Sequence, residues 1–339
     1  MLLSNNKKEK MRYKPIIAIT MGDPAGIGPE IIIKALVHAK IRGSCRPIIV
    51  GDRTPLEEAI ALLKLSVQLR VVQSPEEYRA TPKGRTIELI DTGVAKKIRK
   101  RKPTAEGGKA SVHYIQKAVE LALDKHVDGI VTAPISKEAI HMAGFKWPGH
   151  TEMISELTHT KDYAMMFVGG PLRIILVTIH TPLKKVPSLI SKDRVVKTLR
   201  LAKKACEMLG MKSPKIAVAG LNPHAGEAGL FGDEEIREIN PAVREALREG
   251  IPVVGPFPPD VIFHKAYRGE FDLVVCMYHD QGLIPLKMVA FDKGVNMTVG
   301  LPIIRTSPDH GTAYDIAWKG IANPSSMIEA IKLAARLRI

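Results

Sequence analysis

The segment from Pro15 to Ala39, PIIAITMGDPAGIGPEIIIKALVHA, holds the pattern that decides the fold. It opens on a short apolar run at residues 15–20, passes through a loop rich in glycine and proline, and continues as a segment with helical spacing at residues 29–39. A strand, a short loop and a helix in this order begin a βαβ unit, whose strands are parallel. The segment therefore predicts an α/β protein.

The same alternation repeats along the chain and predicts a largely parallel sheet. A length of 339 residues suggests two domains or one large α/β domain with insertions, and two lobes with a cleft between them are the starting hypothesis. Further strands are expected at residues 46–51, 86–90, 128–133, 172–179, 215–220, 272–277 and 295–301. Further helices are expected at residues 55–64, 108–125, 137–143, 192–209, 234–248 and 326–337.

Composition excludes several protein classes. The chain is 45% hydrophobic and 25% charged, which is typical of a globular enzyme and not of a disordered chain. Cys45, Cys206 and Cys276 lie far apart without C-x-x-C spacing, so neither a disulfide framework nor a thiolate zinc site is indicated. No apolar run approaches the roughly 20 residues of a membrane helix, and residues 1–13 lack the apolar region of a signal peptide. These features predict a cytoplasmic protein with no membrane partner.

The chain is basic, with 50 Lys and Arg against 35 Asp and Glu and a formal charge of +15. Much of the excess lies in two runs, at residues 7–14 and 96–102, and neither contains the interleaved aromatic residues that stack on bases. We expect a basic tail over residues 1–15 and a surface loop around residues 96–102. An RNA-binding protein is an interpretation that rests on charge alone, and no nucleic-acid partner is predicted.

His180, His224 and His279 each lie at or just after the end of an expected strand. In open α/β sheets, ligands bind at the carboxyl ends of the strands. Three neutral imidazoles meeting there would form a divalent metal site, although each histidine alone is as easily a hydrogen-bonded structural residue. Asp280 either orients the imidazole of His279 or caps the following turn.

Other residues indicate an anionic substrate. Lys287, Asn296 and Arg305 lie on three consecutive segments and offer an ammonium, an amide and a guanidinium, the groups that a phosphorylated hydroxy acid requires. Thr151 is expected at a helix N-cap, where backbone amides either bind an anion or are simply capped. The loop at residues 22–30 either holds an anion or is a plain tight turn, and its prolines exclude a dinucleotide-binding fingerprint.

Five stretches together resemble the 4-hydroxythreonine-4-phosphate dehydrogenase family of vitamin B6 synthesis. The similarity runs from about Ile16 to the C-terminus. The stretches are MGDPAGIGPE at residues 21–30, PGHTE at 148–152, NPHAGE at 222–227, MYHDQG at 277–282 and RTSPDHGTA at 305–313.

The resemblance implies a fold of the isocitrate and isopropylmalate dehydrogenase type, two α/β lobes with the active site in the cleft between them. The first lobe would comprise residues 16–145 and 310–339, and the second residues 146–309. An obligate homodimer is implied, with the active site at the subunit interface.

The resemblance also implies the roles of individual residues. One divalent metal per subunit, zinc, magnesium, manganese or cobalt, would be bound by histidines drawn from both chains. NAD is the implied cofactor, with NADP possible. The metal ligands would be His180, His224 and His279, the substrate contacts His150, Thr151, Lys287, Asn296 and Arg305, and the cofactor contacts Gly311, Thr312 and Asp315. The catalytic base is left unassigned, with Asp260 and Asp280 as possibilities.

The implied reaction is oxidation of a C3 hydroxyl by hydride transfer to NAD, followed by decarboxylation. Residues 162–165, 258–263 and 314–318 are more similar to a second branch of the family, which oxidises 4-phospho-D-threonate or 4-phospho-D-erythronate and yields dihydroxyacetone phosphate and carbon dioxide. The alternative substrate is 4-hydroxy-L-threonine 4-phosphate, a precursor of pyridoxal phosphate. A metal-dependent hydrolase or phosphatase is the alternative of another class, since a histidine-bound metal also activates water.

Overall fold

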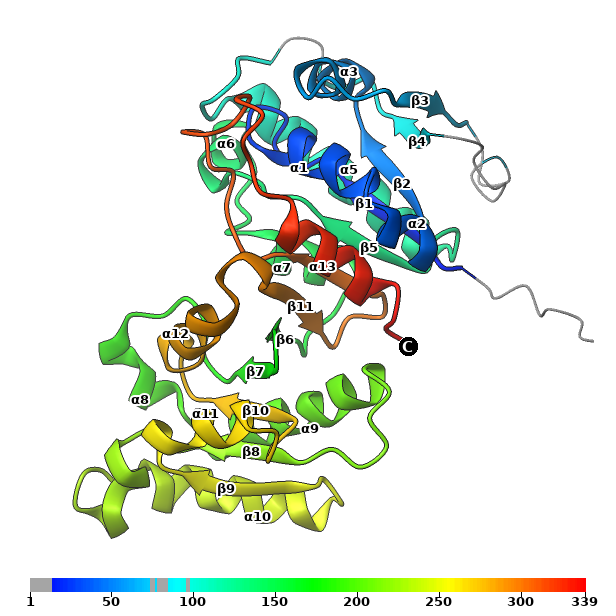
Figure 1. Cartoon of the computed structure of the whole chain (residues 1–339). Coiled ribbons are helices and arrows are strands. Elements are labelled where there is room, and N and C mark those ends of the chain that lie inside the picture. Colours follow the sequence, from blue (N-terminus) through cyan, green and yellow to red (C-terminus); the bar gives the residue numbers. More distant parts are fainter. Residues whose placement is uncertain (1–13, 74–76, 78–84, 96–97) are drawn as a thin grey trace, which may run out of the picture.

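The structure, a computed structural model, describes residues 14–73, 77, 85–95 and 98–339. Most of the expected basic tail and two residues of the second basic run lie outside the described residues. In the described part, twelve strands form one sheet that passes through two lobes (Figure 1). The predicted two-lobed α/β architecture is confirmed, whereas the predicted lobe boundaries stay a prediction.

The upper lobe in Figure 1 contains the first half of the sheet, in the order β3-β4-β2-β1-β5-β12. Strand β1 is buried along its whole length, which requires helices over both of its faces. The strands are β1 (Ile16–Thr20), β2 (Arg46–Gly51), β3 (Gln68–Val71), β4 (Thr86–Asp91), β5 (Gly129–Thr132) and β12 (Arg305–Pro308). The helices are α1 (Gly28–Leu36), α2 (Ala39–Ser44), α3 (Arg53–Leu62), α5 (Ala105–Leu123), α6 (Lys137–Met142) and α13 (Ser325–Ala334).

The lower lobe contains the second half of the sheet, in the order β11-β6-β7-β10-β8-β9. Its strands are β6 (Ala164–Gly169), β7 (Leu172–Leu176), β8 (Ile216–Ala219), β9 (Val253–Phe257), β10 (Leu273–Cys276) and β11 (Val295–Val299). Its α-helices are α8 (Val186–Leu189), α9 (Lys192–Met208), α10 (Asn240–Arg248), α11 (Pro259–Tyr267) and α12 (His279–Ala290), and α7 (His150–Leu157) lies at the junction of the lobes. Shorter helical turns are η1 (Leu183–Lys185), η2 (Pro223–Gly229), η3 (Glu235–Ile239) and η4 (Phe291–Lys293).

The sheet is largely parallel, as predicted, except at its centre. Strand β11 is antiparallel to both β12 and β6, and β6 is antiparallel to β7. The strands β3, β6, β9 and β12 were not predicted from the sequence. Strand β12 has the polar sequence RTSP but is fully buried. Its composition therefore gives no sign that it is a central strand of the sheet.

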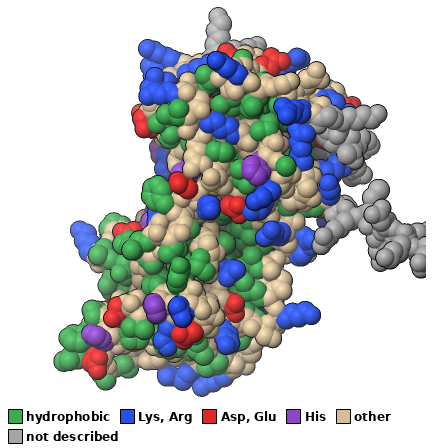
Figure 2. All heavy atoms as spheres, viewed as in Figure 1, with side chains coloured by type: hydrophobic (Ala, Val, Ile, Leu, Met, Phe, Trp, Pro, Cys, Tyr) green, Lys and Arg blue, Asp and Glu red, His purple; other side chains and the backbone are tan. Residues whose placement is uncertain are grey.

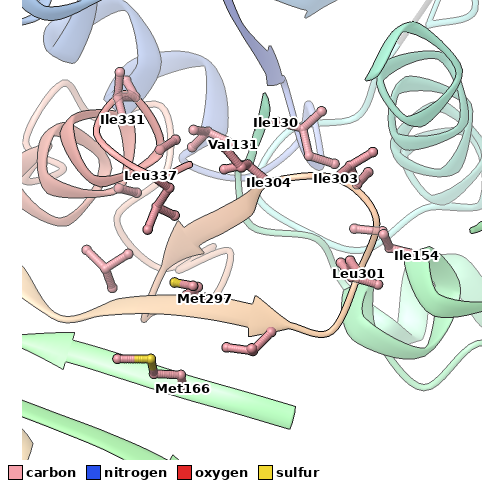
Figure 3. Packing of buried hydrophobic residues seen from close by; sticks show 14 of the residues in the cluster. Ile130, Val131, Ile154, Met166, Met297, Leu301, Ile303, Ile304, Ile331 and Leu337 are labelled. Atoms are coloured by element: carbon pink, nitrogen blue, oxygen red, sulfur yellow. The ribbon is translucent and has the colours of Figure 1, made fainter. Parts of the chain in front are cut away.

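Apolar side chains cross the junction of the lobes without a break (Figure 3). Ile130 on β5 and Ile304 lie on one side, Met297 on β11 lies between, and Met166 on β6 lies on the other. All four are at most 6% exposed and belong to one hydrophobic cluster. The two lobes therefore share a core, which fixes the loops that face each other at the carboxyl ends of the strands.

Across the described ranges, none of the helices has both the length and the apolarity to cross a bilayer.

Candidate active site

A cleft of about 380 Å³ lies between the lobes. Its wall includes residues from the end of β5, the start of α7, the loop after β7, the start of α12, and strands β11 and β12. Of the residues predicted from the sequence, the cleft is lined by His150, Thr151, His180, His279, Asn296, Arg305 and Gly311. Polar lining residues that were not predicted are Thr132, Lys137, Glu152, Ser307, Asp309 and His310.

Arg305, the first residue of β12, is a buried cation in this wall. It is 2% exposed, and its Nη2 and Nη1 atoms donate to the hydroxyls of Thr132 at 2.9 Å and Thr298 at 3.0 Å. Within the described residues no carboxylate forms an ion pair with it. Desolvation lowers the pKa of Arg305 to about 10, so the guanidinium stays charged at neutral pH. A buried cation without a carboxylate partner on a cleft wall is suited to bind an anion.

Two buried polar atoms of the cleft have neither a hydrogen-bond partner nor an ion pair in the described structure. They are Nε2 of His150 and Oδ1 of Asn296. Desolvation, and then the charge of Arg305, lowers the pKa of His150, so its imidazole is neutral. Since an unpaired buried polar group is costly, such atoms favour a ligand that pairs with them.

The helix that carries His150 begins differently from the expectation. Its N-cap is Gly149, and Thr151 lies inside the first turn, so the prediction of Thr151 as N-cap is wrong. Glycine has no side chain to cap the helix, and no side-chain cap is present. Thr151 is 5% exposed and lines the cleft.

His180 and His279 come together at one end of the cleft, with ring centroids 5.7 Å apart. The Nδ1 atom of His279 lies 2.6 Å from Oδ1 of Asp280, which leaves Nε2 of that ring for another partner. Desolvation, and then the charge of Lys137, lowers the pKa of His180. Neutral imidazoles are the form that binds a metal, so these two side chains could supply two nitrogen ligands.

His224 does not join them within one chain. It does not line the cleft, and its ring packs against Phe231 with centroids 6.1 Å apart. In the described part of the chain, no three His, Cys, Asp or Glu side chains are grouped closely enough to hold a metal. The structure therefore unites two of the three predicted metal ligands.

The loop that holds His224 is exposed, has a strained backbone, and is held by hydrogen bonds to a buried carboxylate. Five consecutive residues, 224–228, have positive φ, and four of them are not glycine. Glu235, which is 2% exposed, accepts hydrogen bonds from the backbone amides of Leu221 and Asn222 at 2.7 and 2.8 Å. Left-handed backbone at non-glycine residues is costly and occurs preferentially at functional sites.

Of Lys287 and the three predicted cofactor residues, the structure places only Gly311 in the wall of the cleft. Lys287 does not line the cleft, but its Nζ atom is 2.9 Å from Oδ2 of Asp309, which does. Gly311 lines the cleft, and a Cβ atom added there would meet nothing within 4 Å. Thr312 and Asp315 do not line it, and the carbonyl of Thr312 accepts a hydrogen bond from Ile27.

The glycine-rich loop at residues 22–30 is a tight turn, so its reading as an anion site is not supported. The Tyr314 hydroxyl donates to Oδ2 of Asp23 at 2.5 Å, and the Ile27 amide donates to the carbonyl of Thr312. Gly22 has a φ of +70°, and a Cβ there would lie 2.4 Å from the carbonyl oxygen of Pro134. The loop therefore joins β1 to the segment at residues 312–318.

Sequence reasoning missed two ionisable residues that surround His180, namely Lys137 and Glu152. Both line the cleft and act electrostatically on the imidazole. Their only signal is position, because one follows an expected strand and the other lies in the PGHTE stretch. Asp260 and Asp280, considered for the catalytic base, do not line the cleft.

Comparison with known proteins gives a consistent result. Residues 43–334 match the family of the pyridoxal phosphate biosynthetic protein PdxA. The chain is 49% identical to a 4-hydroxythreonine-4-phosphate dehydrogenase of Desulforapulum autotrophicum, covering 95% of each chain. It is 47% identical to a D-threonate 4-phosphate dehydrogenase of Cupriavidus necator, covering 96% of this chain and 98% of the relative. Its fold is similar to that of a 4-hydroxythreonine-4-phosphate dehydrogenase of Klebsiella pneumoniae, with a TM-score of 0.88, 45% identity, and coverage of 95% and 98%.

Proposed function

The chain belongs to the PdxA family, and on this premise we propose that it oxidises 4-phospho-D-threonate or 4-phospho-D-erythronate with NAD. It is a dehydrogenase that acts on a CH–OH group of a phosphorylated four-carbon compound. The choice of the sugar acid rests on the relatives named D-threonate 4-phosphate dehydrogenase and on residues 162–165, 258–263 and 314–318.

Arg305 is the observation that carries this function. A fully buried guanidinium, hydrogen-bonded only to hydroxyls in the described structure, needs an anion, and a phosphate ester supplies one with two or more acceptor oxygens. His150 and Asn296 then offer their unpaired atoms to a hydroxyl or carboxylate of the same molecule. Charge and hydrogen-bonding capacity both fit a phosphorylated hydroxy acid.

We propose that the metal site is completed across two copies of the chain. His180 and His279 would supply two nitrogens, and His224 of a second copy would supply the third. An all-imidazole donor set favours zinc or cobalt over magnesium. When bound, the metal would polarise the substrate oxygen as a Lewis acid, and NAD would accept the hydride.

Exposed apolar side chains on or next to the elements that carry His279 and His224 support the homodimer. Figure 2 shows hydrophobic side chains gathered on the lower lobe below the waist. Met288 on α12 is 82% exposed and Phe291 is 74% exposed, while Leu230, after the His224 loop, is 74% exposed. Apolar surface of this kind marks protein interfaces.

The reaction would proceed in two balanced steps. First, the C3 hydroxyl would lose its proton to a general base while the C3 hydrogen would pass as hydride to NAD, which would leave a 3-keto acid. Next, the carboxylate leaves as carbon dioxide, its bonding electron pair passes to C2, and C2 takes up a proton. The products are dihydroxyacetone phosphate, carbon dioxide and NADH. Arg305 would hold the phosphate throughout, and Gly311 leaves open space at the cleft edge for the cofactor.

The second candidate substrate is 4-hydroxy-L-threonine 4-phosphate, which the names of other relatives favour. The test offers 4-phospho-D-threonate, 4-phospho-D-erythronate and 4-hydroxy-L-threonine 4-phosphate in parallel to metal-loaded enzyme with NAD. A higher kcat/KM for either sugar acid supports the proposal. A higher value for the amino acid refutes the sugar-acid assignment.

A further inference from the structure

A second pocket, of about 490 Å³, lies at the waist between the lobes and shares no lining residue with the active-site cleft. Its walls come from the β6–β7 hairpin, the start of β11, the segment after α9 and the end of α13. The Arg338 amide donates to the Met208 carbonyl at 3.1 Å, which holds the C-terminus against the end of α9 (Figure 1). The pocket therefore joins elements from both lobes.

The pocket has a large excess of positive charge. It is lined by Arg173, Lys293, Lys332 and Arg336, and by a single acid, Glu329. Glu329 already pairs with Lys332 at 2.7 Å. The other three cations form no ion pair in the described part of the chain, and Arg173 donates only to a backbone carbonyl, at 3.5 Å. Three uncompensated cations around one concavity attract an anion.

The floor of the pocket is apolar. Leu209, Met211 and Leu333 are partly exposed there, whereas Val295 and Leu337 are each only 2% exposed. Figure 3 shows Leu337 beside α13, at the edge of the shared core. An inorganic ion would leave this floor in contact with water, whereas an organic anion would cover it.

We propose that this pocket binds a small phosphate monoester with an apolar body, at a site separate from the active-site cleft. The phosphate contacts Arg173, Lys293 and Arg336, and the apolar body lies on Leu209, Met211 and Leu333. Binding there links the β6–β7 hairpin to α13 and thus connects the two lobes.

Methionine methyl groups distinguish the two sites, since Met211 lines this pocket and Met165 lines the cleft. The metal-loaded full chain is labelled with methyl-¹³C methionine and titrated with phenyl phosphate, inorganic phosphate and phenol. Met211→Leu and Met165→Leu assign the two signals. We expect the Met211 signal to shift saturably with phenyl phosphate, at lower concentration than with either other probe.

The matched variants are K293A/R336A, in the pocket, and R244A/R248A, which removes the same charge from the exposed face of α10. The pocket variant should weaken the Met211 response to phenyl phosphate by about tenfold or more and leave the Met165 response unchanged. The control variant should behave like the wild type. Equal weakening in both variants, or no saturable Met211 shift, would overturn the proposal. If inorganic phosphate bound as tightly as phenyl phosphate, the proposal that the ligand has an apolar body would be overturned.

Discussion

Replacing Arg305 with methionine should separate substrate binding from stability. Burial lowers the pKa of Arg305 from its ordinary value to about 10, which corresponds to about 3 kcal/mol for holding the charge in the folded protein. Its hydrogen bonds to Thr132 and Thr298 return about 1 kcal/mol each. The free energy of unfolding of metal-free R305M should therefore lie within about 1 kcal/mol of the wild type, although a buried charged residue is lost.

The same substitution should lower kcat/KM for the phosphorylated substrate by at least about 100-fold, because two charge-assisted hydrogen bonds to the phosphate are removed. Urea unfolding and the initial rate of NADH formation measure the two quantities. D-threonate, which lacks the phosphate, is the control substrate, and its turnover by wild type and variant should be similar and low. A loss of more than about 3 kcal/mol in unfolding free energy, with kcat/KM little changed, would contradict the role of Arg305 in binding the phosphate. It would show instead that Arg305 stabilises the fold.

Three further predictions concern the histidines. His224→Ala should lose the bound metal while its far-UV circular dichroism stays native, and metal analysis showing a full complement would contradict the shared site. Asp280→Asn should weaken metal affinity about 10- to 100-fold, because the His279 ring loses its orienting partner; competition with a chelator measures this, and an unchanged affinity removes Asp280 from that role. For His150, burial lowers the pKa below 6.5, so below pH 6.5 the unfolded chain binds more protons than the folded one. Stability should fall as the pH drops from 6.5 toward the folded pKa, by up to about 1.4 kcal/mol per pH unit, and His150→Asn should flatten this slope in urea unfolding at several pH values. An unaltered slope would show that the pKa of His150 is the same in the folded and the unfolded state, and would contradict the prediction.

The regular part of the fold could be predicted from sequence because its strands are short, apolar and bounded by turn residues. Strands such as β1 and β10 are buried along their whole length, and their Ile and Val runs reveal this. Helix α12 could not be predicted, because Pro285 and a glycine interrupt its pattern. Strand β12 could not be predicted either, because RTSP is polar.

Two of the failures, β12 and α12, coincide with the candidate site, whereas the unpredicted strands β3 and β9 are the outer edges of the sheet. Strand β12 is polar because it carries Arg305 into the cleft, and α12 begins at His279. At such positions the chemistry of the site overrides local preference. The sequence indicated which residues are chemically suited to the site, but it could not show that His224 lies apart from the other two histidines, since that depends on a strained loop anchored by Glu235.

The most direct test of the account measures NADH and carbon dioxide together, in one reaction of metal-loaded enzyme with 4-phospho-D-threonate and NAD. If the proposed function is correct, both form at equal rates, in a one-to-one ratio, and a chelator stops both. Release of inorganic phosphate without NADH would contradict it and indicate a metal-dependent hydrolase.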